Sequence, residues 1–156
     1  MNDQGEHSGN RFWMGWLTAA TVVMTLFGLA LVVAPDLARE GFSLLVYSSS
    51  EQISGFGPEA ADYVELAHAV MGSVMVGWGV ALLLVLRGPM RRSPAEGVRM
   101  FAISLLCWFV PDIAFSLISG FWQNAVLNLV FALLFAVPLA ALAIRPRTAA
   151  GASEPR

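Results

Sequence analysis

The chain of 156 residues has no lysine, one cysteine and few charged residues of either sign. Charged side chains make up 13% of the sequence and hydrophobic residues 57%, which is unlike an ordinary soluble domain. The single cysteine, Cys107, excludes a disulfide framework and a CxxC redox motif within the chain. Without lysine, the glycine-rich stretches form no phosphate-binding loop. With a formal net charge of −2, we expect no nucleic-acid partner.

The hydrophobic residues gather in four long blocks. About 20 apolar residues in a helix cross the roughly 30 Å hydrocarbon core of a bilayer, and each block reaches that length. We therefore predict an all-α fold, a bundle of four transmembrane helices in one membrane domain over 12–144. A polar tail (1–11) precedes this domain, and a disordered tail (145–156) follows it. The four helices are expected at about 12–34, 58–86, 98–119 and 121–144.

The nine basic residues, all arginine, are distributed unequally along the chain. An even number of spans puts both termini and the second connection on one side, which holds every arginine except Arg39. By the positive-inside rule, that side is cytoplasmic. We expect a multi-pass protein of the cell inner (plasma) membrane with both termini in the cytoplasm. The alanine-rich composition without lysine suggests a bacterium.

The first connection, residues 35–57, is the only sizeable segment expected outside the membrane. Its apolar run from Phe42 to Tyr47 is too short to span, and either a strand or a short interfacial helix fits it. We favour a helix that forms a short extracytoplasmic lid between the first two spans. Pro58 suits the first position of the helix that follows.

The second predicted span carries small residues at every fourth position. Such spacing lets helix backbones approach closely in lipid, so we expect this helix to be the most enclosed of the four. The stripe consists of Ala69, Ser73, Gly77 and Ala81, with Gly72 and Gly79 beside it.

Polar side chains of the last three spans fall at similar depths. At about 1.5 Å per residue, His68, Asp112 and Asn128 each lie roughly 10 Å below the outer boundary. Glu65, Ser116 and Asn124 lie about one turn nearer the exterior. Trp108 shares the helix face of Asp112. Ionisable groups at membrane depth are costly and usually face partners inside a bundle. We predict a polar pocket that opens to the outer side and contains Glu65, His68, Trp108, Asp112, Ser116, Asn124 and Asn128.

This polar layer has more than one interpretation. Its members can simply satisfy one another and fix helix register, or they can bind a small molecule or a lipid head group. A metal site from Glu65, His68 and Asp112 would contain only half of the repeated Glu-x-x-His pattern of di-iron bundles. Haem held by two histidines would need a second protomer or subunit, because His7 lies in the polar tail. The cofactor and any metal stay unknown, and we assign no catalytic residue.

Three features resemble small bacterial DoxX-like membrane proteins: the four-span layout, the glycine-rich second span AHAVMGSVMVGWG with its histidine, and the short turn between the last two spans. The resemblance covers residues 12–144 as architecture. It implies a four-helix bundle associated with quinone-linked oxidoreductase complexes. It transfers no site residue to this chain.

From the residues themselves we expect a non-enzymatic protein, a pocket-bearing or accessory subunit. It would bind a lipid-like or quinone-like molecule in the polar layer near the outer face. The alternative is a redox or metal-dependent oxidoreductase component of the DoxX-like type. The expected partners are the lipid bilayer and either further copies of this chain or a larger membrane complex.

Overall fold

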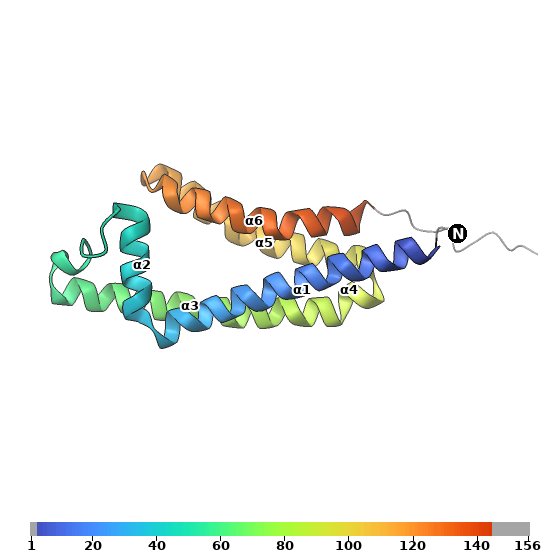
Figure 1. The fold of residues 1–156 in the computed structure, drawn as a ribbon, viewed down its shortest axis with the longest axis horizontal. Helices are drawn as coiled ribbons and strands as arrows, with labels where there is room; N and C mark the ends of the chain where they lie inside the picture. Colours follow the sequence, from blue (N-terminus) through green and yellow to red (C-terminus); the bar gives the residue numbers. More distant parts are fainter. Residues whose placement is uncertain (1–2, 145–156) are drawn as a thin grey trace, which may run out of the picture.

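The computed structural model describes residues 3–144, with side chains described for 9–53 and 55–144. The long helices are α1 (Asp3–Val33), α3 (Pro58–Arg87), α5 (Pro94–Ile118) and α6 (Trp122–Ala143) (Figure 1). The short elements are α2 (Pro35–Tyr47), the 3-10 turn η1 (Ser54–Phe56) and α4 (Pro89–Arg92). Residues 3–144 contain no β-strand, and the prediction of an all-α bundle is confirmed.

Four helical segments are long and apolar enough to cross a membrane. In a bilayer core every backbone polar group must be satisfied internally, which is why such apolar blocks form helices. The first helix begins earlier than expected, at Asp3, because an established helix adds one hydrogen bond for each further residue. The expected tail at 145–156 lies outside the described residues. The four candidate spans are Gly9–Val33, Pro58–Arg92, Pro94–Ile118 and Trp122–Ala143.

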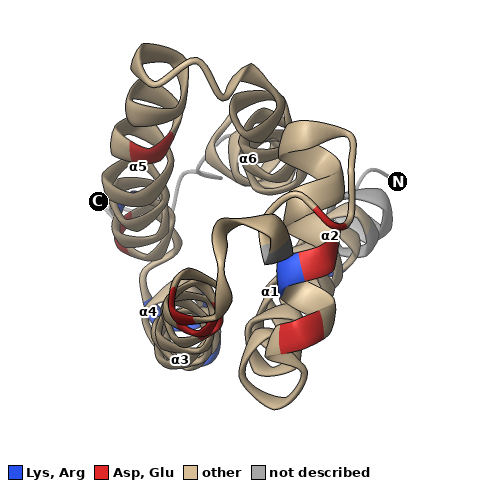
Figure 2. Cartoon of the chain, turned by 90° about the vertical axis from the view of Figure 1, so that its left-hand side faces the viewer, with Lys and Arg blue, Asp and Glu red and all other residues tan. Residues whose placement is uncertain are grey.

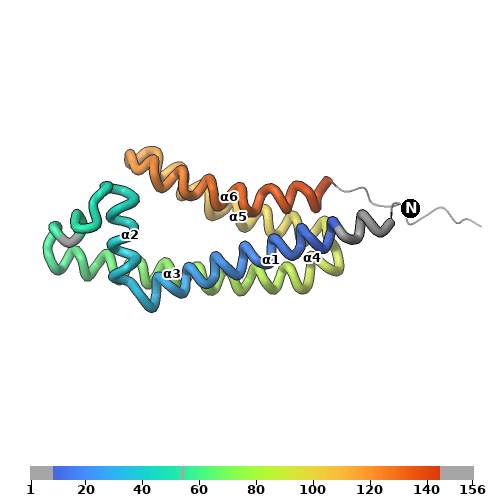
Figure 3. Tube along the Cα trace, in the orientation of Figure 1, coloured from blue at the N-terminus to red at the C-terminus, as the bar shows by residue number. Residues whose placement is uncertain are grey.

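The four long helices pack as two pairs. α1 lies against α3 along much of its length, and α5 lies against α6. Contacts of α1 with α6 and of α3 with α5 join the pairs into a four-cornered bundle, seen end-on in Figure 2. The pairs lie close together near the N-terminus of α1 and separate toward the end that carries α2 (Figure 3). The fully buried side chains Leu17, Leu82, Phe101 and Phe135 form the core of the narrow end.

Glycines set the close approach of α1 and α3. A Cβ atom added to Gly72 would overlap the carbonyl oxygen of Gly28, and one added to Gly79 would overlap the hydroxyl of Thr25. The contact therefore uses Gly72 and Gly79, which lie seven residues apart. The stripe expected from sequence is wrong as the contact face, because only glycine leaves room for a backbone this close. Its members Ser73, Gly77 and Ala81 are exposed.

Helix α2 (Pro35–Tyr47) lies across the wide end of the bundle, transverse to the long helices (Figure 1). It contacts α1, α3 and α6, so it covers this end as a lid. The buried Ser43 hydroxyl donates to the carbonyl of Ser49 at 2.6 Å and accepts from the amide of Ile53 at 3.4 Å. These two bonds tie the connection back onto α2. The helical alternative for the run Phe42 to Tyr47 is confirmed, and the strand alternative is wrong.

Candidate ligand-binding cavity

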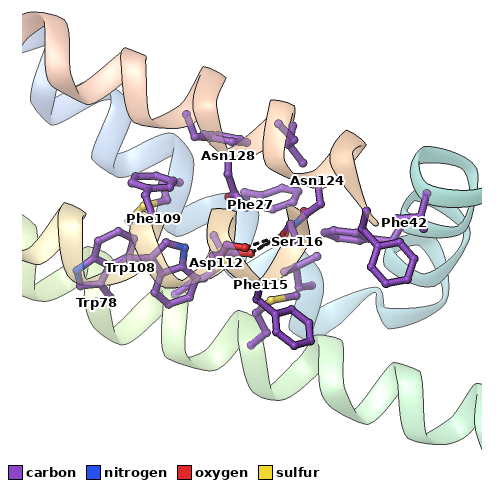
Figure 4. Close-up of a pocket in the computed structure, with 18 of the residues that line it drawn as sticks. Phe27, Phe42, Trp78, Trp108, Phe109, Asp112, Phe115, Ser116, Asn124 and Asn128 are labelled. Carbon is purple, nitrogen blue, oxygen red and sulfur yellow. Dashed lines mark hydrogen bonds between the residues drawn. The ribbon is translucent and has the colours of Figure 1, made fainter. Parts of the chain in front are cut away.

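A cavity of about 350 Å³ lies between the two helix pairs, next to α2. Its walls come from α1, α2, α3, α5 and α6, so both helix pairs and α2 shape it. About half of the lining side chains are aromatic. Ligand pockets usually measure about 300–1,000 Å³ and combine apolar walls with a few polar groups, as this cavity does. Apart from its aromatic residues, the polar residues of the lining are Asp112, Ser116, Asn124 and Asn128 (Figure 4).

Three of these residues form one hydrogen-bonded cluster across α5 and α6. The amide Nδ2 of Asn124 donates to Asp112 Oδ1 at 3.1 Å and to Ser116 Oγ at 2.8 Å. Ser116 Oγ in turn donates to the backbone carbonyl of Asp112 at 2.7 Å. The cluster forms because a tight turn at Gly120, whose φ is +81°, makes the two helices antiparallel neighbours. The side chain of Asp112 thereby stays directed into the cavity (Figure 4).

Asn128 lies one helical turn beyond Asn124 on α6 and also lines the cavity. Its side chain is only 8% exposed. Its Nδ2 atom makes no hydrogen bond with any part of the chain that the structure describes. A buried donor left without a partner costs about 1–3 kcal/mol. The cavity therefore offers a hydrogen-bond donor that an acceptor on a bound molecule would satisfy.

Two stacked tryptophans line the part of the cavity that faces the narrow end of the bundle. The rings of Trp78 on α3 and Trp108 on α5 lie 5.0 Å apart between centroids and are inclined by 10°. Trp78 Nε1 donates to Ser104 Oγ at 2.6 Å, which fixes its ring against α5. Trp108 was expected at the site. Trp78 was missed, since its helix position alone gives no sign that it faces Trp108.

The other two residues of the expected polar layer do not line the cavity. Glu65 forms an ion pair with Arg39 of α2. The buried ring of His68 lies 4.9 Å from that of Phe42, and its Nδ1 lies 2.7 Å from the carbonyl of Val64 on its own helix. The expectation of a single pocket is therefore wrong for Glu65 and His68. Both face α2, where Glu65 meets Arg39 and His68 packs on Phe42, which itself lines the cavity.

Arg39 is the residue that sequence reasoning missed at this end. Its side chain is 18% exposed and also lies 3.8 Å from Asp36. Its position as the one arginine in an acidic connection could have indicated an ion pair with a nearby acid. From the sequence, we used this position only as evidence for the orientation in the membrane. With 30 residues, α3 exceeds the roughly 20 needed to span, and its first turns lie at the end of the bundle that α2 covers.

The expected metal ligands are not brought together. Within the part of the chain that the structure describes, no three His, Cys, Asp or Glu side chains gather closely enough to hold a metal ion. Asp112 lies in the cavity, whereas Glu65 and His68 lie outside its lining. The side chain of His7, considered for haem, is outside the described residues.

The four apolar spans define the class of this protein: it is a small multi-pass integral membrane protein with a helical bundle. Comparisons with protein-family models, with curated proteins and with solved structures find no match. The cavity and its polar cluster are therefore the features from which a function can be argued.

Proposed function

We propose that the protein is a non-enzymatic binding or accessory protein of the bacterial inner membrane. It holds one lipid-like or quinone-like molecule in the cavity beneath α2. The observation that carries this proposal is the buried Nδ2 of Asn128, which has no partner among the described residues, close to the Asp112 cluster in a cavity rich in aromatic side chains. An amphiphile matches this arrangement, because its polar group meets the cluster and its apolar part meets the rings.

An opening toward the bilayer supports the same proposal. Phe115 lines the cavity and is nevertheless 69% exposed, which places it at a mouth of the cavity. It lies on α5, one of the four spans. A molecule dissolved in the membrane would enter beside Phe115 without crossing the polar end of the protein.

A variant that fills the cavity tests the proposal. Leu127 lines the cavity, whereas Leu129 on the same helix is 52% exposed on the outer surface of the bundle. We expect Leu127→Trp to abolish retention of the bound molecule, because the larger ring occupies its space. Leu129→Trp serves as the matched control and should retain it. The measurement is mass spectrometry of organic extracts from the purified proteins, and equal retention in all three would contradict the proposal.

The alternative is a redox or metal-dependent component of the DoxX-like type. Under that alternative the bound molecule is a quinone, and Asn128 Nδ2 donates to one of its carbonyl oxygens. The same extracts distinguish the two functions. Quinone together with a visible absorption band or a stoichiometric metal would favour the redox component, whereas colourless, metal-free protein with a lipid would favour the binding protein.

The orientation is also a proposal: both termini face the cytoplasm, and α2 faces outward. The arginines support it: Arg39 is the one arginine of the connection that contains α2 (Figure 2), whereas the connection at the opposite end is flanked by Arg87, Arg91, Arg92 and Arg99. In a Cys107→Ser background, we expect Ser50→Cys to react with an impermeant maleimide added to intact cells. Glu96→Cys, exposed at the opposite end, should react only after permeabilisation. The reverse labelling pattern would overturn the orientation.

A further inference from the structure

The cavity lining contains one carboxylate, many aromatic rings and, among the residues that the structure describes, no Arg or His. We propose that the cavity selects amphiphiles with a positively charged ammonium group, which lies beside the carboxylate of Asp112. This inference rests on the proposed function, because it names the head-group class of the molecule bound there.

The carboxyl group of Asp112 has no cationic partner in the described part of the chain. Arg39, the basic residue nearest to this end, is engaged by Glu65 and Asp36. Asn124 Nδ2 donates to Asp112 Oδ1. The Ser116 hydroxyl, which donates to the backbone carbonyl of Asp112, lies 3.4 Å from the same carboxyl oxygen, and neither group carries a charge. A charge at membrane depth is costly unless it is paired. An ammonium group in the cavity would provide that pairing.

The aromatic walls favour the same head group. A cation within about 6 Å of a ring centroid is attracted to the face of the ring. The carboxyl group of Asp112 points toward Ser116 and Asn124 (Figure 4), and the rings of Trp108, Phe115 and Phe27 line the same cavity. An ammonium group bound to Asp112 would therefore share the cavity with aromatic rings, which attract quaternary ammonium ligands.

The rest of the lining fits the remainder of such a molecule. Met71, Met75 and Leu127 provide adaptable apolar surface for an alkyl chain. The free donor of Asn128 requires an acceptor, so the molecule also carries an oxygen such as a hydroxyl or an ester carbonyl. Both a lipid head group with an ammonium and a free amphiphilic amino alcohol satisfy this chemistry.

The test uses decyltrimethylammonium as the probe and 1-decanol as its uncharged counterpart of equal chain length. Each is titrated into the purified, delipidated full chain in dodecyl maltoside, with calorimetric detection and empty micelles as the blank. We expect the cation to bind at least about tenfold more tightly than the alcohol. Asp112→Asn, which keeps the shape and hydrogen bonding, should weaken cation binding about tenfold more than it weakens decanol binding.

Two further variants exclude a merely structural effect. Asp112→Glu restores the charge and should recover most of the preference for the cation. Glu59→Gln removes an exposed acid outside the cavity and should change neither affinity. Displacement of the probe by short-chain phosphatidylethanolamine would identify a lipid head group as the source of the ammonium. If the lipid does not displace the probe, the source is a free amphiphilic amine.

The failures of the two proposals are distinguishable. If decanol binds as tightly as the cation and Asp112→Asn changes neither, the ammonium proposal is overturned while the cavity still binds an amphiphile. If neither probe binds and extracts of wild-type protein contain no retained molecule, the proposed function is overturned as well.

Discussion

Replacing Gly72 with alanine is expected to destabilise the bundle by about 1–3 kcal/mol, the usual cost of forcing extra volume into a packed contact. The added methyl group would overlap the carbonyl oxygen of Gly28 and crowd the Cβ of Leu31 at 2.8 Å. Backbone atoms cannot rotate away as a flexible side chain can, so α1 and α3 must move apart. Because both helices line the cavity, ligand retention should fall together with stability.

Gly77 provides the matched control on the same helix. A Cβ atom there meets nothing within 4 Å. Alanine is a better helix former than glycine by about 1 kcal/mol, so Gly77→Ala should be neutral or mildly stabilising. Thermal unfolding of both variants in neutral detergent measures the difference. Equal melting temperatures would mean that the helices do not meet through Gly72.

Removing the Arg39 side chain is expected to weaken the packing of α2 against the wide end of the bundle. Arg39 and Glu65 are both largely shielded from solvent, with side chains 18% and 24% exposed. Removing one partner of such a pair leaves the other charge without its counter-ion, which is destabilising. Arg39→Met should therefore increase amide hydrogen exchange throughout α2, whereas exchange at the narrow end should stay unchanged.

A double variant separates the pairing from the loss of side-chain volume. Arg39→Met leaves Glu65 without its partner, and adding Glu65→Gln removes that uncompensated charge. We expect the double variant to recover part of the stability lost in the single one, which indicates coupling between the two side chains. Strictly additive losses would show that the ion pair does not hold α2 in place. The exposed neighbour Glu40→Gln is the control and should have no effect.

The spans could be predicted because hydropathy alone determines which segments become helices in a bilayer. The cluster of Asp112, Ser116 and Asn124 could be predicted as well. Its two helices are joined by a turn of a few residues, so counting depth from that turn places the side chains next to each other. Local chain geometry was sufficient in this part of the protein.

The partners of α3 could not be predicted in the same way. Depth along a helix does not say in which direction a side chain points, and nothing local joins α3 to the lid. His68 was therefore expected to face Asp112, whereas its ring lies against Phe42 of α2. Likewise, small-residue spacing indicates a close helix contact, but Gly72 and Gly79 make it only because α1 brings Gly28 and Thr25 opposite them.

The most direct test of the binding cavity is an electron-density map from crystals of the wild-type protein grown in a lipidic mesophase. The account predicts elongated non-protein density between the two helix pairs, with one polar atom within hydrogen-bond distance of Asn128 Nδ2 and another beside Asp112. A map in which the α5–α6 pair closes onto α1 and α3, with Asn128 bonded to the protein and no space left between the pairs, would contradict it.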